Sequence, residues 1–377
     1  MEKLYNYTET IEIEEKEVSP EFVDLKIIKD DKETEPQKIR RDDQEVDVSF
    51  IVLLTDSKEL NIEDGSYNLD LLGNPMVTYV ARACTKEPSY IKYDGKSDVA
   101  SLIKPYLGTS EYTMVLYSDT PLMTRENVLN ILDFVNTKGL NVCKLTRGYV
   151  FKTEYLKRVD EIYVPSVYYF EEEDFLMAVS YKQVHYISEV LKNRIVSYHM
   201  NNGVYFKCPD NTYIEANVSI GKGSVIYPFV SLLGNTKIGE NVIVETNSYL
   251  KNAKVFDNAQ IEGASLEGAI VQEKAKIKRG AKLFSQTAIK KGAQVGQDSI
   301  ISNAIVGEYS MVGKNSIINY LKCGEGVSIG DNSRISATQE MPVIIEDRAV
   351  LENNVTLLKG VKVVKEQKVE EGTTLKN

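Results

Sequence analysis

The second half of the chain repeats an aliphatic residue at every sixth position. The first series keeps this interval without a break: Ile214, Ile220, Ile226, Leu232, Ile238, Val244 and Leu250. After an interruption the spacing returns at Val271, Ile277, Leu283, Ile289, Val295 and Ile301, then at Val306, Val312 and Ile318, and finally at Ile345, Leu351, Leu357, Val363 and Val369. A period of six cannot line one face of an α-helix, which turns once every 3.6 residues. It fits short strands separated by tight turns, so we predict a solenoid.

Residues two places before the first series share the inner face in this prediction: Val218, Ser224, Val230, Thr236, Val242 and Ser248. With three six-residue faces in each coil, residues 213–375 make about nine coils, each stacked only on its neighbours. The pattern resembles the left-handed parallel β-helix of hexapeptide-repeat acyltransferases and sugar nucleotidyltransferases. The left hand is implied by this resemblance alone, as is assembly into a homotrimer through the flat sides of the β-helix. We place the β-helix at residues 204–377.

Composition limits what the remaining 203 residues can be. The net charge is −10, and residues 1–47 hold 16 acids and 8 bases, so we interpret them as an acidic N-terminal extension. An acidic chain repels polyanions, and we expect no nucleic-acid partner. No apolar run reaches the ~18 residues of a membrane span and the start lacks an export signal, so we expect no membrane partner and a cytoplasmic location. The four cysteines lack Cys-x-x-Cys spacing and are expected to be buried thiols.

Residues 48–182 read as an α/β domain. Residues 48–54 and 112–118 are apolar runs typical of buried strands. Pro75 is placed to open a helix, and Thr124 can cap a second helix with an apolar face. This strand-helix order favours a parallel sheet. Residues 183–203 have helical periodicity and end at Gly203, which predicts a linker helix.

Three stretches resemble one family, the bifunctional N-acetylglucosamine-1-phosphate uridylyltransferases and glucosamine-1-phosphate acetyltransferases. Residues 191–195, 199–204 and 209–214 are together similar to its junction between the catalytic domain and the β-helix. Residues 72–76, Leu-Gly-Asn-Pro-Met, resemble its helix-opening motif. Residues 117–124, Tyr-Ser-Asp-Thr-Pro-Leu-Met-Thr, resemble its metal-binding motif and place Asp119 as a candidate magnesium ligand. The resemblance implies a reduced, Rossmann-like nucleotidyltransferase domain.

The residues that would carry uridylyl transfer are mostly missing. Where the family has a glycine-rich loop with an arginine, residues 55–60 read Thr-Asp-Ser-Lys-Glu-Leu, so Glu59 reverses the charge that faces a triphosphate. Ser180 stands where the resemblance implies a second metal ligand, and one carboxylate with one hydroxyl is a weak magnesium site. Residues 145–151, Leu-Thr-Arg-Gly-Tyr-Val-Phe, resemble a sugar-contacting motif that has lost its asparagine. The domain is also shorter than the family's catalytic domain, so walls of the pocket are missing.

Acetyl transfer lacks its general base. The resemblance implies a histidine in the β-helix, but the only histidines, His185 and His199, precede it, and we expect both to have packing or capping roles. Phe284 stands where a substrate-binding arginine is expected.

We therefore predict a catalytically degenerate member of this group with a structural or regulatory role. We predict no catalytic or cofactor-binding residue, and the one cofactor expected is magnesium at Asp119, as a relic. The predicted partners are further copies of the chain in a homotrimer, a nucleotide sugar or sugar phosphate, and an active paralogue. Two alternatives stay open. One is an active sugar-1-phosphate nucleotidyltransferase that uses Lys58 and Asp119, and the other is an acyltransferase that binds coenzyme A between β-helix coils.

Overall fold

The computed structural model describes residues 46–159 and 172–377. The acidic extension expected at residues 1–47 lies, except for its last two residues, outside the described residues. The described chain forms two compact units that meet in sequence between Arg194 and Ile195. Each unit has a hydrophobic core of its own.

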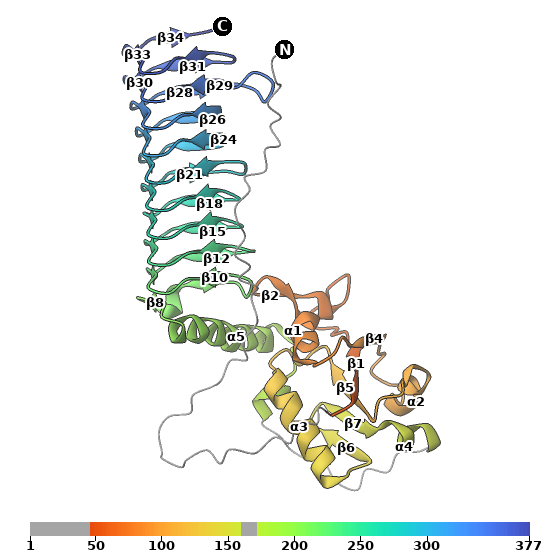
Figure 1. The fold of residues 1–377 in the computed structure, drawn as a ribbon. Helices are drawn as coiled ribbons and strands as arrows, with labels where there is room; N and C mark the ends of the chain where they lie inside the picture. Colours follow the sequence, from red (N-terminus) through yellow and green to blue (C-terminus); the bar gives the residue numbers. More distant parts are fainter. Residues whose placement is uncertain (1–45, 160–171) are drawn as a thin grey trace, which may run out of the picture. The chain divides into compact units, whose positions relative to one another are not determined.

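The sheet of the α/β unit has strand order β4-β1-β5-β7-β6 (Figure 1). Its strands are β1 Val48–Leu54, β4 Ser89–Lys92, β5 Tyr112–Tyr117, β6 Val142–Leu145 and β7 Gly148–Lys152. β1 runs parallel to β4 and β5, whereas β7 runs antiparallel to both β5 and β6. The prediction of a parallel sheet is therefore wrong, and the sheet is mixed. The reason is the β6–β7 connection: Leu145 pairs with Gly148, and a two-residue turn joins only antiparallel strands.

Helices cover both faces of this sheet. The described α-helices are α1 Met76–Ala83, α2 Val99–Ile103, α3 Arg125–Lys138, α4 Thr153–Arg158 and α5 Tyr181–Asn201. Phe50 and Val52 of β1 lie in one core cluster with residues of α1 and α3, while Ile51 and Leu53 lie in a second cluster with residues of α2 and α4. Strand alternation explains this division, because successive side chains point to opposite faces.

The two expected helix starts are confirmed. Pro75 directly precedes α1, where its missing N–H costs no hydrogen bond. The Thr124 hydroxyl accepts a hydrogen bond from the backbone N–H of Asn127 at 3.2 Å and so caps α3. The α3 side chains predicted to share one face are all buried: Val128, Ile131, Leu132 and Val135.

The second unit is a left-handed parallel β-helix of about ten turns over residues 205–375 (Figure 1). Every residue of the predicted six-residue series is buried in one continuous core. Short strands recur at this interval, for example β10 Ser219–Ile220, β11 Val225–Ile226 and β12 Ser231–Leu233. Each strand pairs with the equivalent strand of the next coil, as when Ile226 pairs with Val244. The predicted solenoid is therefore confirmed, with about ten turns over residues 205–375 where about nine were predicted for residues 213–375.

The interruption after Leu250 comes from faces of five residues. The inward-facing position moves by five residues from Leu250 to Val255, and again from Leu266 to Val271. The six-residue spacing is therefore broken, while the coils continue to stack. Several corners carry an asparagine with positive φ, such as Asn241 at 54° and Asn315 at 54°. Asparagine tolerates this left-handed backbone better than most residues do, which makes it suitable for these tight corners.

Small polar side chains on the inner face join neighbouring coils. The Ser224 hydroxyl donates to the carbonyl of Gly239 at 2.8 Å and accepts from the N–H of Val242 at 3.0 Å. Ser299 and Ser316 make equivalent bonds one coil apart. Among the described residues no buried side-chain N or O atom is left without a hydrogen-bond partner. The buried hydroxyls thus stabilise the stacking instead of weakening the core.

Helix α5, Tyr181–Asn201, occupies the stretch predicted as a linker helix and ends before Gly203, which has φ of 86°. His199 is buried at 4% exposure, as expected for a packing role. Burial lowers the pKa of His199 to about 4. His185 was expected to pack as well, but its side chain is exposed, because it lies on the solvent-facing side of α5.

The four cysteines are free thiols. Cys84, Cys143 and Cys323 are buried as expected, but Cys208 is only half-buried, because it lies in the short connection that precedes the first full coil. None of the helices in the described part of the chain is long and apolar enough to span a membrane.

Candidate functional site

The candidate site of the α/β unit lies where β1 and β5 end. Both strands run parallel, so their carboxyl ends reach the same edge of the sheet. Asp119 follows β5 by two residues and is 3% exposed. Ligands of open α/β sheets bind at such an edge. Asp119 therefore lies at the edge of the sheet where a ligand would bind.

Arg147 holds both carboxylate oxygens of Asp119. Its Nε donates to Oδ1 at 3.1 Å and its Nη2 donates to Oδ2 at 2.6 Å. Arg147 lies in the β6–β7 turn, and Gly148 allows that turn to approach β5. A Cβ on Gly148 would lie 2.6 Å from the carbonyl oxygen of Val115, and its φ of 141° is one that few side chains adopt. The two-pronged pairing is the strongest geometry available between a guanidinium and a carboxylate.

An aromatic ring fixes the other side of the guanidinium. The Cζ of Arg147 lies 4.0 Å from the ring centroid of Tyr117. Tyr117 is itself packed edge-on against Tyr93, with centroids 5.8 Å apart. Burial raises the pKa of the Tyr117 phenol above its ordinary value, so this ring stays neutral and attractive to a cation.

The loop after β1 uses its own backbone donors internally. The N–H of Thr55 donates to the Ser118 hydroxyl at 3.0 Å, and the N–H of Ser57 donates to the Ser66 hydroxyl at 2.8 Å. The N–H of Ser66 donates in turn to Oδ1 of Asp56 at 2.9 Å. A loop that cradles phosphate must leave its N–H groups free to point at the ligand. Here serine hydroxyls and an aspartate occupy these donors.

A cleft of about 580 Å³ opens beside this loop. Its lining residues come from the ends of β1 and β4 and from the loop between them: Leu54, Asp56, Glu63, Asp64, Gly65, Tyr67, Asn68, Lys92 and Tyr93. Three of these side chains are carboxylates and one is an ammonium. Lys58 and Glu59 are both exposed. The local charge therefore opposes a triphosphate.

Ser180 also comes to this part of the unit. The N–H of Ala178 donates to the carbonyl oxygen of Asp119 at 2.8 Å, and the Ser57 hydroxyl donates to the carbonyl of Val179 at 2.6 Å. The three segments that the sequence analysis grouped are thus adjacent in the fold. The Ser180 hydroxyl, however, donates to Oε1 of Gln183 at 2.8 Å and accepts from its N–H, so it caps α5.

These residues do not fit a magnesium ion as they are arranged. Magnesium needs oxygen ligands at about 2.1 Å and a net negative site. Both Asp119 oxygens face a guanidinium, and the Ser180 hydroxyl is used by Gln183. No group of three or more histidine, cysteine, aspartate or glutamate side chains suited to a metal occurs in the described ranges. Magnesium at Asp119 stays a prediction, one that needs Arg147 to move away.

The junction predicted from residues 191–195 has a structural role within the α/β unit. The Nη1 of Arg194 donates to the carbonyl of Leu122 at 2.7 Å, and its Nη2 lies 3.7 Å from Oδ1 of Asp174. The side-chain amide of Asn127 donates to the other oxygen of Asp174. Arg194 thus fixes the segment that follows Asp119.

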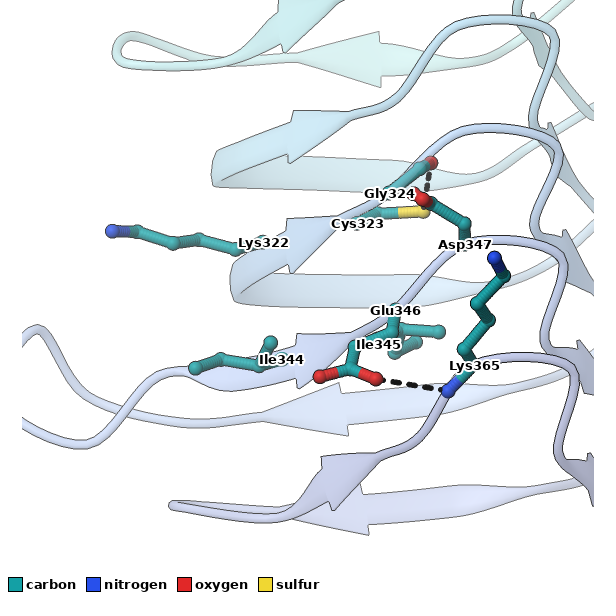
Figure 2. Close-up of a pocket in the computed structure, with 8 residues that line it drawn as sticks. All are labelled: Lys322, Cys323, Gly324, Ile344, Ile345, Glu346, Asp347 and Lys365. Carbon is teal, nitrogen blue, oxygen red and sulfur yellow. Dashed lines mark hydrogen bonds between the residues drawn. The ribbon is translucent and has the colours of Figure 1, made fainter.

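A second pocket, of about 380 Å³, lies on the β-helix (Figure 2). Figure 2 shows Lys322 and Ile344 pointing out from one side, with Cys323, Asp347 and Lys365 on the other. Two of its acid–base groups, Asp347 and Cys323, already interact with the β-helix around them. Asp347 accepts from the N–H of Glu325 at 2.9 Å, and burial raises the pKa of the Cys323 thiol to about 11. Phe284, at the position expected for an arginine, is 38% exposed and offers no charge.

Sequence reasoning missed Arg147 as the partner of Asp119. It registered Arg147 only as part of a shortened sugar-contacting motif, because 28 residues separate the pair and only the β5–β7 register brings them together. It also missed Ser66 and Ser118 as internal acceptors.

Comparison with known proteins supports the solenoid. Residues 211–252 match the family described as "Bacterial transferase hexapeptide (six repeats)", and residues 303–338 and 337–359 match "Hexapeptide repeat of succinyl-transferase". The Bifunctional protein GlmU of Alkaliphilus metalliredigens is 34% identical over 145 residues, which cover 38% of this chain and 32% of that protein. The Bifunctional protein GlmU of Streptococcus agalactiae serotype V is 34% identical over 120 residues, 32% of this chain and 26% of that protein.

Among solved structures, LpxA from Acinetobacter baumannii is 16% identical over an alignment that covers 45% of this chain and 68% of that chain, with a TM-score of 0.25. The chain spans about a third or less of the length of the curated relatives it matches. The matches lie in the C-terminal part, where the chain carries hexapeptide repeats similar to those of the GlmU proteins.

Proposed function

We propose that this GlmU-like protein catalyses neither nucleotidyl transfer nor acetyl transfer and has a structural or regulatory role. The observation that carries the proposal is the loop after β1. The backbone N–H groups of Thr55 and Ser57 donate to serine hydroxyls of the same unit. A triphosphate would have to break these bonds and replace them, at a cost of about 1 kcal/mol for each bond.

Charge supports the same conclusion. Asp56, Glu63 and Asp64 line the cleft, against the single ammonium of Lys92. Lys58, which the active alternative uses, is exposed next to Glu59. A nucleotide would therefore approach a field of its own sign, which lowers both the rate and the affinity of binding.

The β-helix gives acetyl transfer no better support. Neither histidine of the chain belongs to it, since His185 and His199 lie in α5. In the β-helix pocket, the Cys323 thiol has a raised pKa and Asp347 accepts a backbone hydrogen bond. A general base needs a pKa near the working pH, which the raised pKa of the Cys323 thiol does not meet.

The test is a pair of turnover assays with the full chain. Pyrophosphate release is measured with UTP, N-acetylglucosamine-1-phosphate and Mg²⁺, and free coenzyme A is measured with acetyl-CoA and glucosamine-1-phosphate. We expect both rates to equal those of Asp119→Asn and of buffer alone. Pyrophosphate release that Asp119→Asn abolishes would establish the nucleotidyltransferase alternative. Release of coenzyme A above background would establish the acyltransferase alternative.

Ligand binding without turnover is measured separately by thermal melting. A bound ligand raises the melting temperature by mass action. We propose a nucleotide sugar or sugar phosphate as the ligand of a regulatory role, and UDP-N-acetylglucosamine without Mg²⁺ is the first compound to test. The highest concentration tested is about 5 mM, which is 100-fold above an affinity of about 50 µM. If no UDP-sugar shifts the melting temperature at this concentration, the structural role remains, with an active paralogue as the partner.

We also propose assembly as a homotrimer through the flat sides of the β-helix. Apolar side chains point outward from one sheet of the β-helix, where Met311 is 53% exposed and Val350 is 38% exposed, two coils further along. Sedimentation equilibrium of the full chain tests this, with Met311→Glu and Val350→Glu combined as the variant. A monomeric mass for the unmodified chain at micromolar concentration would refute it.

A further inference from the structure

We infer that Arg147 is the built-in counter-ion of Asp119 and that it excludes a divalent cation from this carboxylate. The inference concerns the cation and not the reaction, so it can fail while the proposed function stands. It rests on a buried ion pair that nothing in the similarity to known proteins accounts for.

The pair is built so that the guanidinium cannot easily leave. The Asp119 side chain is 4% exposed and that of Arg147 is 28% exposed. Two parallel hydrogen bonds, at 3.1 Å and 2.6 Å, fix the orientation of the guanidinium. The Tyr117 ring, 4.0 Å from Cζ, fixes its plane. Since arginine stays protonated at all ordinary pH values, no change of pH releases the carboxylate by neutralising its partner.

The neighbouring oxygens do not compensate for this occupation. The Ser118 hydroxyl accepts the Thr55 N–H at 3.0 Å, and the carbonyl oxygen of Asp119 accepts the Ala178 N–H at 2.8 Å. A divalent cation at Asp119 would therefore meet a fixed positive charge and few free oxygen ligands. Removing Arg147 makes the local charge favourable to a cation, because the buried carboxylate of Asp119 is left without a partner.

Binding of Mn²⁺, followed by loss of the electron paramagnetic resonance signal of the free ion, tests the inference in the full chain. The variants are Arg147→Ala, Asp119→Asn, and the two combined. Arg125→Ala is the matched control, because it removes one exposed positive charge at the start of α3. Surface carboxylates bind Mn²⁺ equally in all variants, so only differences between them matter.

We expect wild type, Asp119→Asn and Arg125→Ala to bind the same amount of Mn²⁺. Arg147→Ala should bind more Mn²⁺ than the combined variant, and the difference should appear at millimolar free Mn²⁺, because Asp119 is the main ligand left to the ion. The inference is overturned if wild type binds one ion more than Asp119→Asn, or if Arg147→Ala gains nothing over the combined variant.

Folding of the variants is checked by thiol labelling of Cys84 and Cys143, which are buried in the core of the α/β unit. If Arg147→Ala exposes them, Arg147→Gln takes its place, since glutamine keeps one donor to Asp119 while removing the charge. The same excess of bound Mn²⁺ over Arg147→Gln combined with Asp119→Asn then decides the question.

Discussion

A column of glycines along the β-helix offers a sharp test of how its coils are held together. Gly296, Gly313 and Gly330 occupy the same place in successive coils. A Cβ on Gly313 would lie 2.5 Å from the carbonyl carbon of Gly330 and 2.5 Å from the backbone nitrogen of Asp331. These are backbone atoms that cannot rotate away. In Gly313→Ala the two coils must therefore separate until the contact reaches an ordinary 3.4 Å, an opening of about 0.9 Å.

That opening breaks specific hydrogen bonds. The N–H of Gly313 donates to Ile329 at 2.7 Å, and the N–H of Met311 donates to Val327 at 2.8 Å. Adding the opening takes both bonds to about 3.6 Å, beyond the range of a hydrogen bond. At about 1 kcal/mol each, with their burial, the loss lowers the free energy of unfolding by about 2–3 kcal/mol.

Urea unfolding followed by far-ultraviolet circular dichroism measures this, since the chain has no tryptophan. The control is Gly326→Ala, where φ is +63° and the nearest atom to the new Cβ is a side-chain carbon at 3.7 Å. It should cost about 1 kcal/mol, from backbone strain alone. Hydrogen exchange should speed up at Met311 and Gly313 only in Gly313→Ala. Equal stability of the two variants would refute the stacking argument.

Two further predictions concern buried titratable groups. Burial lowers the pKa of His199 from 6.5 to about 4. Between these two pH values the unfolded chain binds a proton at His199 and the folded chain does not. This stability is present above pH 6.5 and is lost as the pH falls from 6.5 to 4, by about 3 kcal/mol in total. Urea unfolding at pH 7 and pH 5 should show the decline, and His199→Gln should reduce it; an unchanged slope would contradict the assignment. Burial also raises the pKa of Cys84 to about 12 and that of Cys143 to about 11, while Cys208 is only half-buried. Thiol labelling of the native chain at pH 8, resolved by peptide mass spectrometry, should therefore modify Cys208 first, and faster labelling of Cys84 would show that its core opens.

The β-helix was predictable because one rule governs all its coils. An aliphatic residue at every sixth position reports directly on burial, and each member of the series from Ile214 to Val369 is buried. The five-residue faces escaped prediction for a physical reason. Shortening a corner by one residue, as between Leu250 and Val255, shifts the count without changing the composition or the pairing of the strands.

The α/β unit was predictable only where the evidence was local. The strand at residues 48–54 and the helix capped by Thr124 are each specified by a few adjacent residues. The antiparallel β7 and the pairing of Arg147 with Asp119 depend on the register between β5 and β7, which short strands with similar composition do not reveal. Asp119 lies at the sheet edge, directly after a strand that the sequence predicts. Its counter-ion Arg147 comes from the β6–β7 turn, which the sequence analysis treated only as part of a sugar-contacting motif.

The β-helix also shows where such a chain can change at little cost. Between β28, Arg334–Ser336, and β29, Val343–Ile345, the chain makes a longer excursion, yet Leu357 still stacks on Ile335 and Val363 on Ile345. The extra residues lie at a corner, and the strands on either side of them keep their pairing with the next coil. A corner of one coil can therefore lengthen while the strands on either side keep their pairing.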